Sequence, residues 1–147
     1  MTNLESEAPA RLRGLYERYL REVEQLELNR KPGAGYFGIK GGVADDPCHE
    51  RFAEALRGFY TDFAAGEPSS AAARELMAYA CTLPKEAETP RAAFWMLLAV
   101  QGLALPLVGL LDASDAAALC ALYESTYRRS ERLPVQIKLI KALKARA

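Results

Sequence analysis

The chain has 147 residues, of which 50% are hydrophobic and 26% charged, and its 19 basic residues balance its 19 acidic residues. These values are ordinary for one globular domain, and they exclude a disordered chain, a collagen-like chain and a disulfide-rich miniprotein. A net charge of zero also argues against a protein devoted to coating nucleic acid, although it is compatible with a local basic patch.

The N-terminal half begins with a helical pattern followed by a glycine-rich segment. Residues 1–8 are polar and are expected to fray, whereas apolar side chains recur three and four residues apart over residues 9–29. That spacing predicts an amphipathic helix beginning at Pro9. Residues 30–45 then hold five of the ten glycines and show no helical pattern. We expect a Gly-rich loop there, with a short hairpin through Tyr36–Val43 as the alternative.

Capping residues mark the next two helices. Asp46 suits an N-cap and is followed by a proline and an apolar stripe, so a second helix is expected to run to about residue 65. A third helix is expected after a serine cap at Ser69 or Ser70, and Leu83–Pro84 should end it.

The segment from Ala92 to Leu111 is almost wholly apolar, with Gln101 as its single strongly polar side chain. Twenty such residues are long enough to cross a bilayer, so a membrane span is one interpretation. We favour a buried central helix, because the apolar stripes of the other helices need a partner to cover them. It should stop or kink near residues 103–105, just before Pro106.

Two further helices complete the pattern, one capped by Ser114 and one opened by Pro134. The sequence therefore predicts an all-α fold: residues 1–147 form a single helical domain, a bundle of about six helices around the central apolar helix. The two segments that begin at Asp46 and Ser114 start alike but do not align further. A short helical-repeat array is the alternative architecture.

The cysteines and the N-terminus bear on location. Cys48, Cys81 and Cys120 are odd in number and widely spaced, which favours reduced thiols over a disulfide framework. The first residues have neither the basic nor the apolar region of a secretory signal. We therefore expect a cytoplasmic protein.

One glycine motif matches a nucleotide-binding pattern only in its letters. Gly33, Gly35 and Gly38 have the spacing G-x-G-x-x-G, which binds a pyrophosphate when it lies between a strand and a helix. Here a helix precedes it, and the acidic residue expected about 20 positions later on a strand is missing. We interpret the motif as part of a loop.

The densest polar cluster of the chain includes Asp45, Asp46, Cys48, His49 and Glu50, with the sole histidine. Cys48 and His49 would be the second and third residues of the second helix, where backbone amides favour a thiolate. Cys48 should then be the most reactive thiol, with a lowered pKa. Adjacent helical side chains do not face each other, so no Cys–His dyad is expected. The cluster also lacks the ligand spacing of a metal site, and no metal is expected.

The C-terminal residues 128–147 are strongly basic, with seven Lys or Arg side chains against Glu131 alone. Lys138, Lys141 and Lys144 lie on one side of the last helix, opposite its apolar stripe. This face could bind phosphate, but basic residues also suit the C-terminal end of any helix.

Three classes of function remain open. The first is a protein-interaction or adaptor module that uses the Gly-rich loop and the adjoining helix start. The second is a small-molecule binding protein or enzyme using Cys48 and His49, and the third is nucleic-acid binding through the basic C-terminus. We rank them in that order because no catalytic constellation is present. The partner would be a protein or a small ligand rather than nucleic acid or a membrane, and no cofactor is expected. The candidate binding residues are Tyr36, Phe37, Lys40, Asp45, Asp46, Cys48, His49 and Glu50.

Overall fold

The computed structural model describes residues 3–28, 48–86 and 91–147. These residues are almost entirely helical and contain no strand, so the expected all-α helical bundle is confirmed. The helices of nine or more residues in this part of the chain are α1 (Asn3–Leu28), α2 (His49–Ala65), α3 (Ser70–Thr82), α4 (Arg91–Ala99), α6 (Ala113–Thr126) and α7 (Pro134–Arg146). The Gly-rich loop and its alternative hairpin lie outside the described residues.

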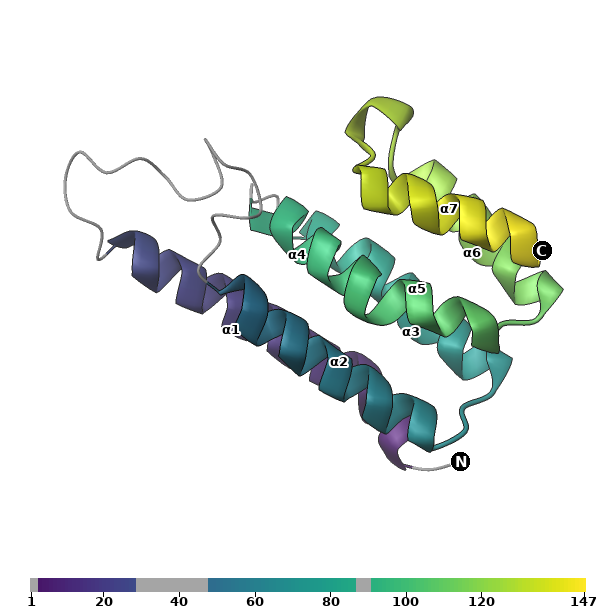
Figure 1. The fold of residues 1–147 in the computed structure, drawn as a ribbon, viewed down its shortest axis with the longest axis horizontal. Coiled ribbons are helices and arrows are strands. Elements are labelled where there is room, and N and C mark those ends of the chain that lie inside the picture. Colours follow the sequence, from purple (N-terminus) through teal and green to yellow (C-terminus); the bar gives the residue numbers. More distant parts are fainter. Residues whose placement is uncertain (1–2, 29–47, 87–90) are drawn as a thin grey trace.

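The helices form three stacked tiers, each an antiparallel pair (Figure 1). The pairs are α1 with α2, α3 with the segment from α4 to α5 (Leu105–Leu107), and α6 with α7. In the stack, α3 contacts both α1 and α6, while the α4–α5 segment contacts both α2 and α7. Such stacking of hairpins is the geometry of helical-repeat proteins.

The apolar segment is the partner of α3 in the middle tier, but it is not one regular helix. After α4 it continues as a π-helical turn (Val100–Ala104), α5 and a 3₁₀ turn (Val108–Leu110). In the π-helical turn the N–H of Leu105 donates to the carbonyl of Val100, five residues back. Pro106 has no N–H with which to continue an α-helical ladder. The expected kink near residues 103–105 therefore begins earlier, at Val100.

This segmentation bears on the membrane alternative. No helix within residues 3–28, 48–86 and 91–147 has both the length and the apolar composition that a bilayer crossing requires.

Aromatic side chains fill the space between the first two tiers. Trp95 of α4 is fully buried, with its ring centroid 5.3 Å from that of Tyr16 and 5.6 Å from that of Tyr19. Tyr19 in turn meets Phe52 of α2 edge-on at 5.2 Å. Offset and tilted pairs of this kind are favoured by the ring quadrupoles in addition to the area they bury. Leu98 of the same helix is also buried.

Three helix starts differ from the sequence prediction. α1 begins at Asn3 with Pro9 inside it. Ala8 is buried and extends the apolar stripe by one helical turn, because it lies four residues before buried Leu12. α2 begins at His49 with Cys48 at its N-cap, so the helix starts later than an Asp46 cap implies. α6 is capped by Asp112 rather than Ser114: the Asp112 side chain accepts from the Asp115 N–H at 2.8 Å.

The other helix limits agree with the prediction. Ser69 caps α3 by accepting from the Ala72 N–H at 3.1 Å, and Pro134 is the first residue of α7. α3 ends at Thr82 and is followed by a 3₁₀ turn at Leu83–Glu86.

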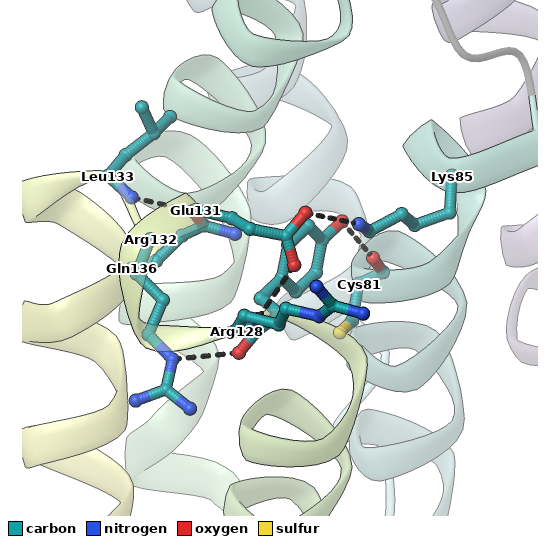
Figure 2. A network of polar contacts seen from close by, with 8 residues as sticks. Cys81, Lys85, Arg128, Glu131, Arg132, Leu133 and Gln136 are labelled. Atoms are coloured by element: carbon teal, nitrogen blue, oxygen red, sulfur yellow. Dashed lines mark hydrogen bonds and ion pairs between the residues drawn. The ribbon is translucent and has the colours of Figure 1, made fainter.

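A polar network ties the connection between α6 and α7 to the end of α3 (Figure 2). The Tyr127 hydroxyl donates to the Cys81 carbonyl at 2.7 Å, and Lys85 Nζ lies 3.0 Å from Glu131 Oε2. The other Glu131 oxygen accepts from the Arg128 N–H at 2.7 Å. The bond from Arg128 and the ion pair with Lys85 lower the pKa of Glu131. The network thus joins the middle and last tiers.

The core makes one prediction about stability. Leu98→Ala should lower the free energy of unfolding by about 2–5 kcal/mol, because it leaves a cavity in the middle tier. Denaturant unfolding followed by Trp95 fluorescence measures this cost. Native Trp95 emission resembling that of tryptophan in water would contradict the burial of this residue.

The network makes a second prediction, about acid. A carboxylate whose folded pKa is lowered stabilises the fold above its unfolded pKa, and that stabilisation is lost as the pH falls through the folded pKa. Glu131→Gln removes the contribution, so its Tm should fall less than the wild-type Tm between about pH 5 and about pH 3. The control is Glu75→Gln, because exposed Glu75 makes no ion pair within the described residues. Equal falls for Glu131→Gln and wild type would contradict the prediction.

Candidate functional site

The structure describes part of the predicted site. Five of its eight residues fall outside the described ranges; they are Tyr36, Phe37, Lys40, Asp45 and Asp46. Of the remaining three, Cys48 is buried, His49 is half-buried and Glu50 is exposed. These three side chains are neighbours in sequence at the start of α2, and they point in different directions around it.

Cys48 is 2% exposed, which bears on its expected reactivity. It lies at the N-cap of α2, two positions earlier relative to the helix than the sequence suggested. Cys81 and Cys120 are also buried, and burial raises the pKa of Cys81 to about 12 and that of Cys120 above its ordinary value. The higher reactivity of Cys48 stays a prediction, but the burial of its thiol opposes it, because a thiolate must be accessible to react.

A shallow depression of about 760 Å³ lies beside the start of α2. Among the described residues, its lining comes from α2 alone: His49, Glu50, Arg51, Ala53, Glu54 and Arg57. Two of its arginines are already paired, Arg57 with Glu54 and Arg51 with Glu22 of α1. Such exposed pairs contribute little stability, but they leave those two arginines less available to a ligand.

A second hollow, of about 560 Å³, has two walls and lies between α1 and α2. We call it the α1–α2 groove. It is lined by Arg11, Gly14, Leu15 and Arg18 of α1 and by Ala55, Gly58, Phe59 and Asp62 of α2. The half-buried Leu15 and Phe59 give it apolar surface, while its charged residues and both glycines are exposed.

The antiparallel pairing of the two helices orders these residues along the groove. Near one end Arg51 pairs with Glu22, and the Arg18 guanidinium lies 5.4 Å from the Phe52 ring centroid. Moving back along α1 means moving forward along α2. Gly14 therefore faces the region of Gly58 near the centre of the groove, and Arg11 and Asp62 lie towards its other end.

The two central glycines are not required by packing within the described residues. A Cβ built on Gly14 or Gly58 meets no other atom within 4 Å. Gly102 differs, because a Cβ there would lie 3.2 Å from Leu56 Cβ, where α2 packs against the π-helical turn. Glycine inside a helix costs roughly 0.5–1 kcal/mol relative to alanine. Gly14 and Gly58 thus keep the groove open at a cost in stability.

Charge distinguishes the groove from the surface around it. Neither Arg11 nor Arg18 forms an ion pair with another described residue, and the same holds for Asp62. Arg51 and Arg57, on the neighbouring face of α2, are both paired. Among the described residues, the groove therefore offers two guanidinium groups without an ion-pair partner on one wall and one such carboxylate on the other.

Two arginines of the basic C-terminus hydrogen-bond to backbone carbonyls. Arg132 donates to the carbonyls of Tyr127 and Glu124, at 2.9 and 3.2 Å. Arg146 donates to the carbonyls of Leu111 and Gly109, at 2.8 and 3.1 Å. Bonds of this kind satisfy carbonyls that helix ends leave without an internal partner.

Lys144 is also engaged, since its Nζ lies 3.5 Å from Glu124 Oε2. Lys138 and Lys141 stay exposed on α7. Arg128, Arg129 and Arg146 are exposed as well, so a basic surface is retained. The ion pair of Lys144 and the backbone bonds of Arg132 and Arg146 leave fewer of its donors for phosphate.

Within the described residues, no group of three His, Cys, Asp or Glu side chains lies close enough together to hold a metal ion. No family model matches the chain, and comparisons with curated proteins and with solved structures also gave no match.

Sequence reasoning missed the α1–α2 groove. Its signal was present in Gly14 and Gly58, each a glycine on the polar side of a strongly amphipathic helix.

The glycines make a third prediction. Gly14→Ala and Gly58→Ala should each raise the free energy of unfolding by about 0.5–1 kcal/mol, because alanine favours the helix and its Cβ meets nothing. Gly102→Ala is the matched contrast, and it should give no such gain because it crowds Leu56. Chemical denaturation of the three variants tests this. Equal gains at all three positions would contradict the packing difference.

Proposed function

We propose that the chain is a protein-interaction module that binds a helical segment of a partner in the α1–α2 groove. This keeps the class of function favoured by the sequence and moves its surface from the Gly-rich loop to the groove. The observation that carries it is the pair of mid-helix glycines, Gly14 and Gly58, in one hollow that the described part of the chain leaves unfilled.

The two faces of the first tier support a helix as the occupant. The inner face of α1 and α2 is covered by α3 and α4, which contact these helices and bury Tyr16, Tyr19 and Phe52. The groove lies among the exposed residues of the same pair, between two helices that run antiparallel (Figure 1). A helix lying along two others inserts its side chains into the groove between them.

The absence of side chains at the centre supports close approach. Helices normally pack with their axes 8–10 Å apart, depending on the side chains at the contact. Glycine on both walls lets the backbone of a partner come nearer than larger residues would. Leu15 and Phe59 are half-buried and would lose their remaining contact with water on binding, which favours association.

The test fills the groove without disturbing the fold. Gly14→Gln/Gly58→Gln puts two long polar side chains into the hollow, and glutamine favours a helix over glycine. Gly109→Gln is the control, because a Cβ at this exposed glycine also meets nothing within 4 Å. Tagged wild type and both variants are incubated with lysate of the native host, and retained proteins are quantified by mass spectrometry.

We expect a specific protein to be retained by wild type and Gly109→Gln and to be lost from the double variant. Thermal unfolding confirms that all three chains are folded. Retention of the same proteins by all three, or none above a tag-only control, would contradict the proposal.

A further inference from the structure

The uncompensated charges of the α1–α2 groove indicate which helix fits it. Arg11 and Arg18 are seven residues apart, so two turns of α1 bring both to nearly the same face, about 10.5 Å apart along the axis. Both are exposed and neither pairs with a described acidic residue. A helix lying along α1 presents its own residues at the same repeat.

We propose that the occupant is an acidic amphipathic helix with two carboxylates seven residues apart and a small residue between them. This inference rests on the proposed function. Each carboxylate meets one guanidinium, whose planar fork matches its two oxygens. The small residue lies over Gly14 and Gly58, so the apolar side chains on either side of it reach Leu15 and Phe59.

The two ends of the groove are not equivalent. Arg11 lies towards the end that holds Asp62, whereas Arg18 lies towards the end near Arg51. Arg18 and Arg51 both approach the ring of Phe52, with guanidinium carbons 5.4 and 5.3 Å from its centroid. The Asp62 carboxylate opposes an acidic group at its own end. Arg18 is therefore the stronger anchor, and Asp62 reduces the affinity.

The surrounding charges favour an acidic occupant over a second copy of the chain. Two copies facing through this surface would bring Arg11 and Arg18 of one near the same arginines of the other. That arrangement leaves four guanidinium groups and two Asp62 carboxylates in one interface, an excess of positive charge. A dimer through the groove is therefore an outcome that the experiment must detect.

The experiment measures binding of defined peptides to the full chain by fluorescence anisotropy. The probe is a labelled, capped, alanine-rich peptide of about 18 residues, long enough to hold a helix. It carries Leu on one face and two Glu residues seven apart beside an Ala. The first control peptide has Gln for both Glu, and the second has its two Glu residues on opposite faces.

We expect the acidic peptide to bind about tenfold more tightly than either control, with an affinity that falls as salt is raised. Arg18→Gln should weaken it more than Arg11→Gln does, and Asp62→Asn should tighten it about twofold to fivefold. Arg57→Gln is the matched control, an exposed arginine outside the groove that is paired with Glu54. It should leave the affinity unchanged.

The outcomes separate this inference from the proposed function. Equal binding of the Glu and Gln peptides, both lost in Gly14→Gln/Gly58→Gln, would overturn the acidic partner and leave helix binding intact. No binding of the acidic peptide up to about 1 mM would also overturn the acidic partner. Sedimentation could instead show a dimer of the wild type that the same double variant abolishes. A second copy of the chain would then be the occupant, which would also overturn the acidic partner. The proposed function itself falls only if protein retention from lysate does not depend on the two glycines.

Discussion

The close packing of the apolar middle tier against α2 is the constraint on which the rest of the structure depends. At Gly102 the π-helical turn approaches α2 so closely that a Cβ would lie 3.2 Å from Leu56 Cβ. Seven residues earlier, Trp95 packs against Tyr16 and Tyr19 of α1. These contacts fix α1 and α2 as a pair on one side of the tier. The groove between them is a consequence of this pairing, because their apolar stripes turn inward and their glycines turn outward.

Much of the fold could be predicted because it follows from local patterns. The apolar stripes predicted the helices, and Ser69 and Pro134 marked the starts of two of them. The uniformly apolar segment lies in the middle tier, beside α3. Errors arose where local rules compete. Asp112 and Ser114 are both good N-caps, and Asp112 is also held by α3, where the Ser70 hydroxyl accepts from its N–H at 2.8 Å. The π-helical turn was also missed, because its wider ladder depends on Gly102 fitting against α2 as well as on Pro106.

The candidate site was less predictable, because the groove is formed by two helices and cannot be seen in the sequence pattern of either helix alone. The sequence predicts a binding site around Cys48, because a cysteine, the sole histidine and three acidic residues lie close together there. The thiol of Cys48 is buried in the structure. Gly14 and Gly58 are 44 positions apart, and their shared groove appears only when α1 and α2 pair antiparallel. Similarly, the basic C-terminus was read as a single patch, whereas Arg132 and Arg146 are engaged with backbone carbonyls. Hydrogen bonds between distant residues cannot be read from charge counts.

The most direct test of the central claim uses the backbone amides of the ten glycines as position markers. Half of them lie in residues 30–45 and two in the α1–α2 groove, so a ¹H–¹⁵N NMR titration with the acidic helical peptide distinguishes the two surfaces. We predict that the largest glycine shifts occur at Gly14 and Gly58, with Gly109 unchanged. Largest shifts among the glycines of residues 30–45, with Gly14 and Gly58 unmoved, would contradict the groove as the binding surface.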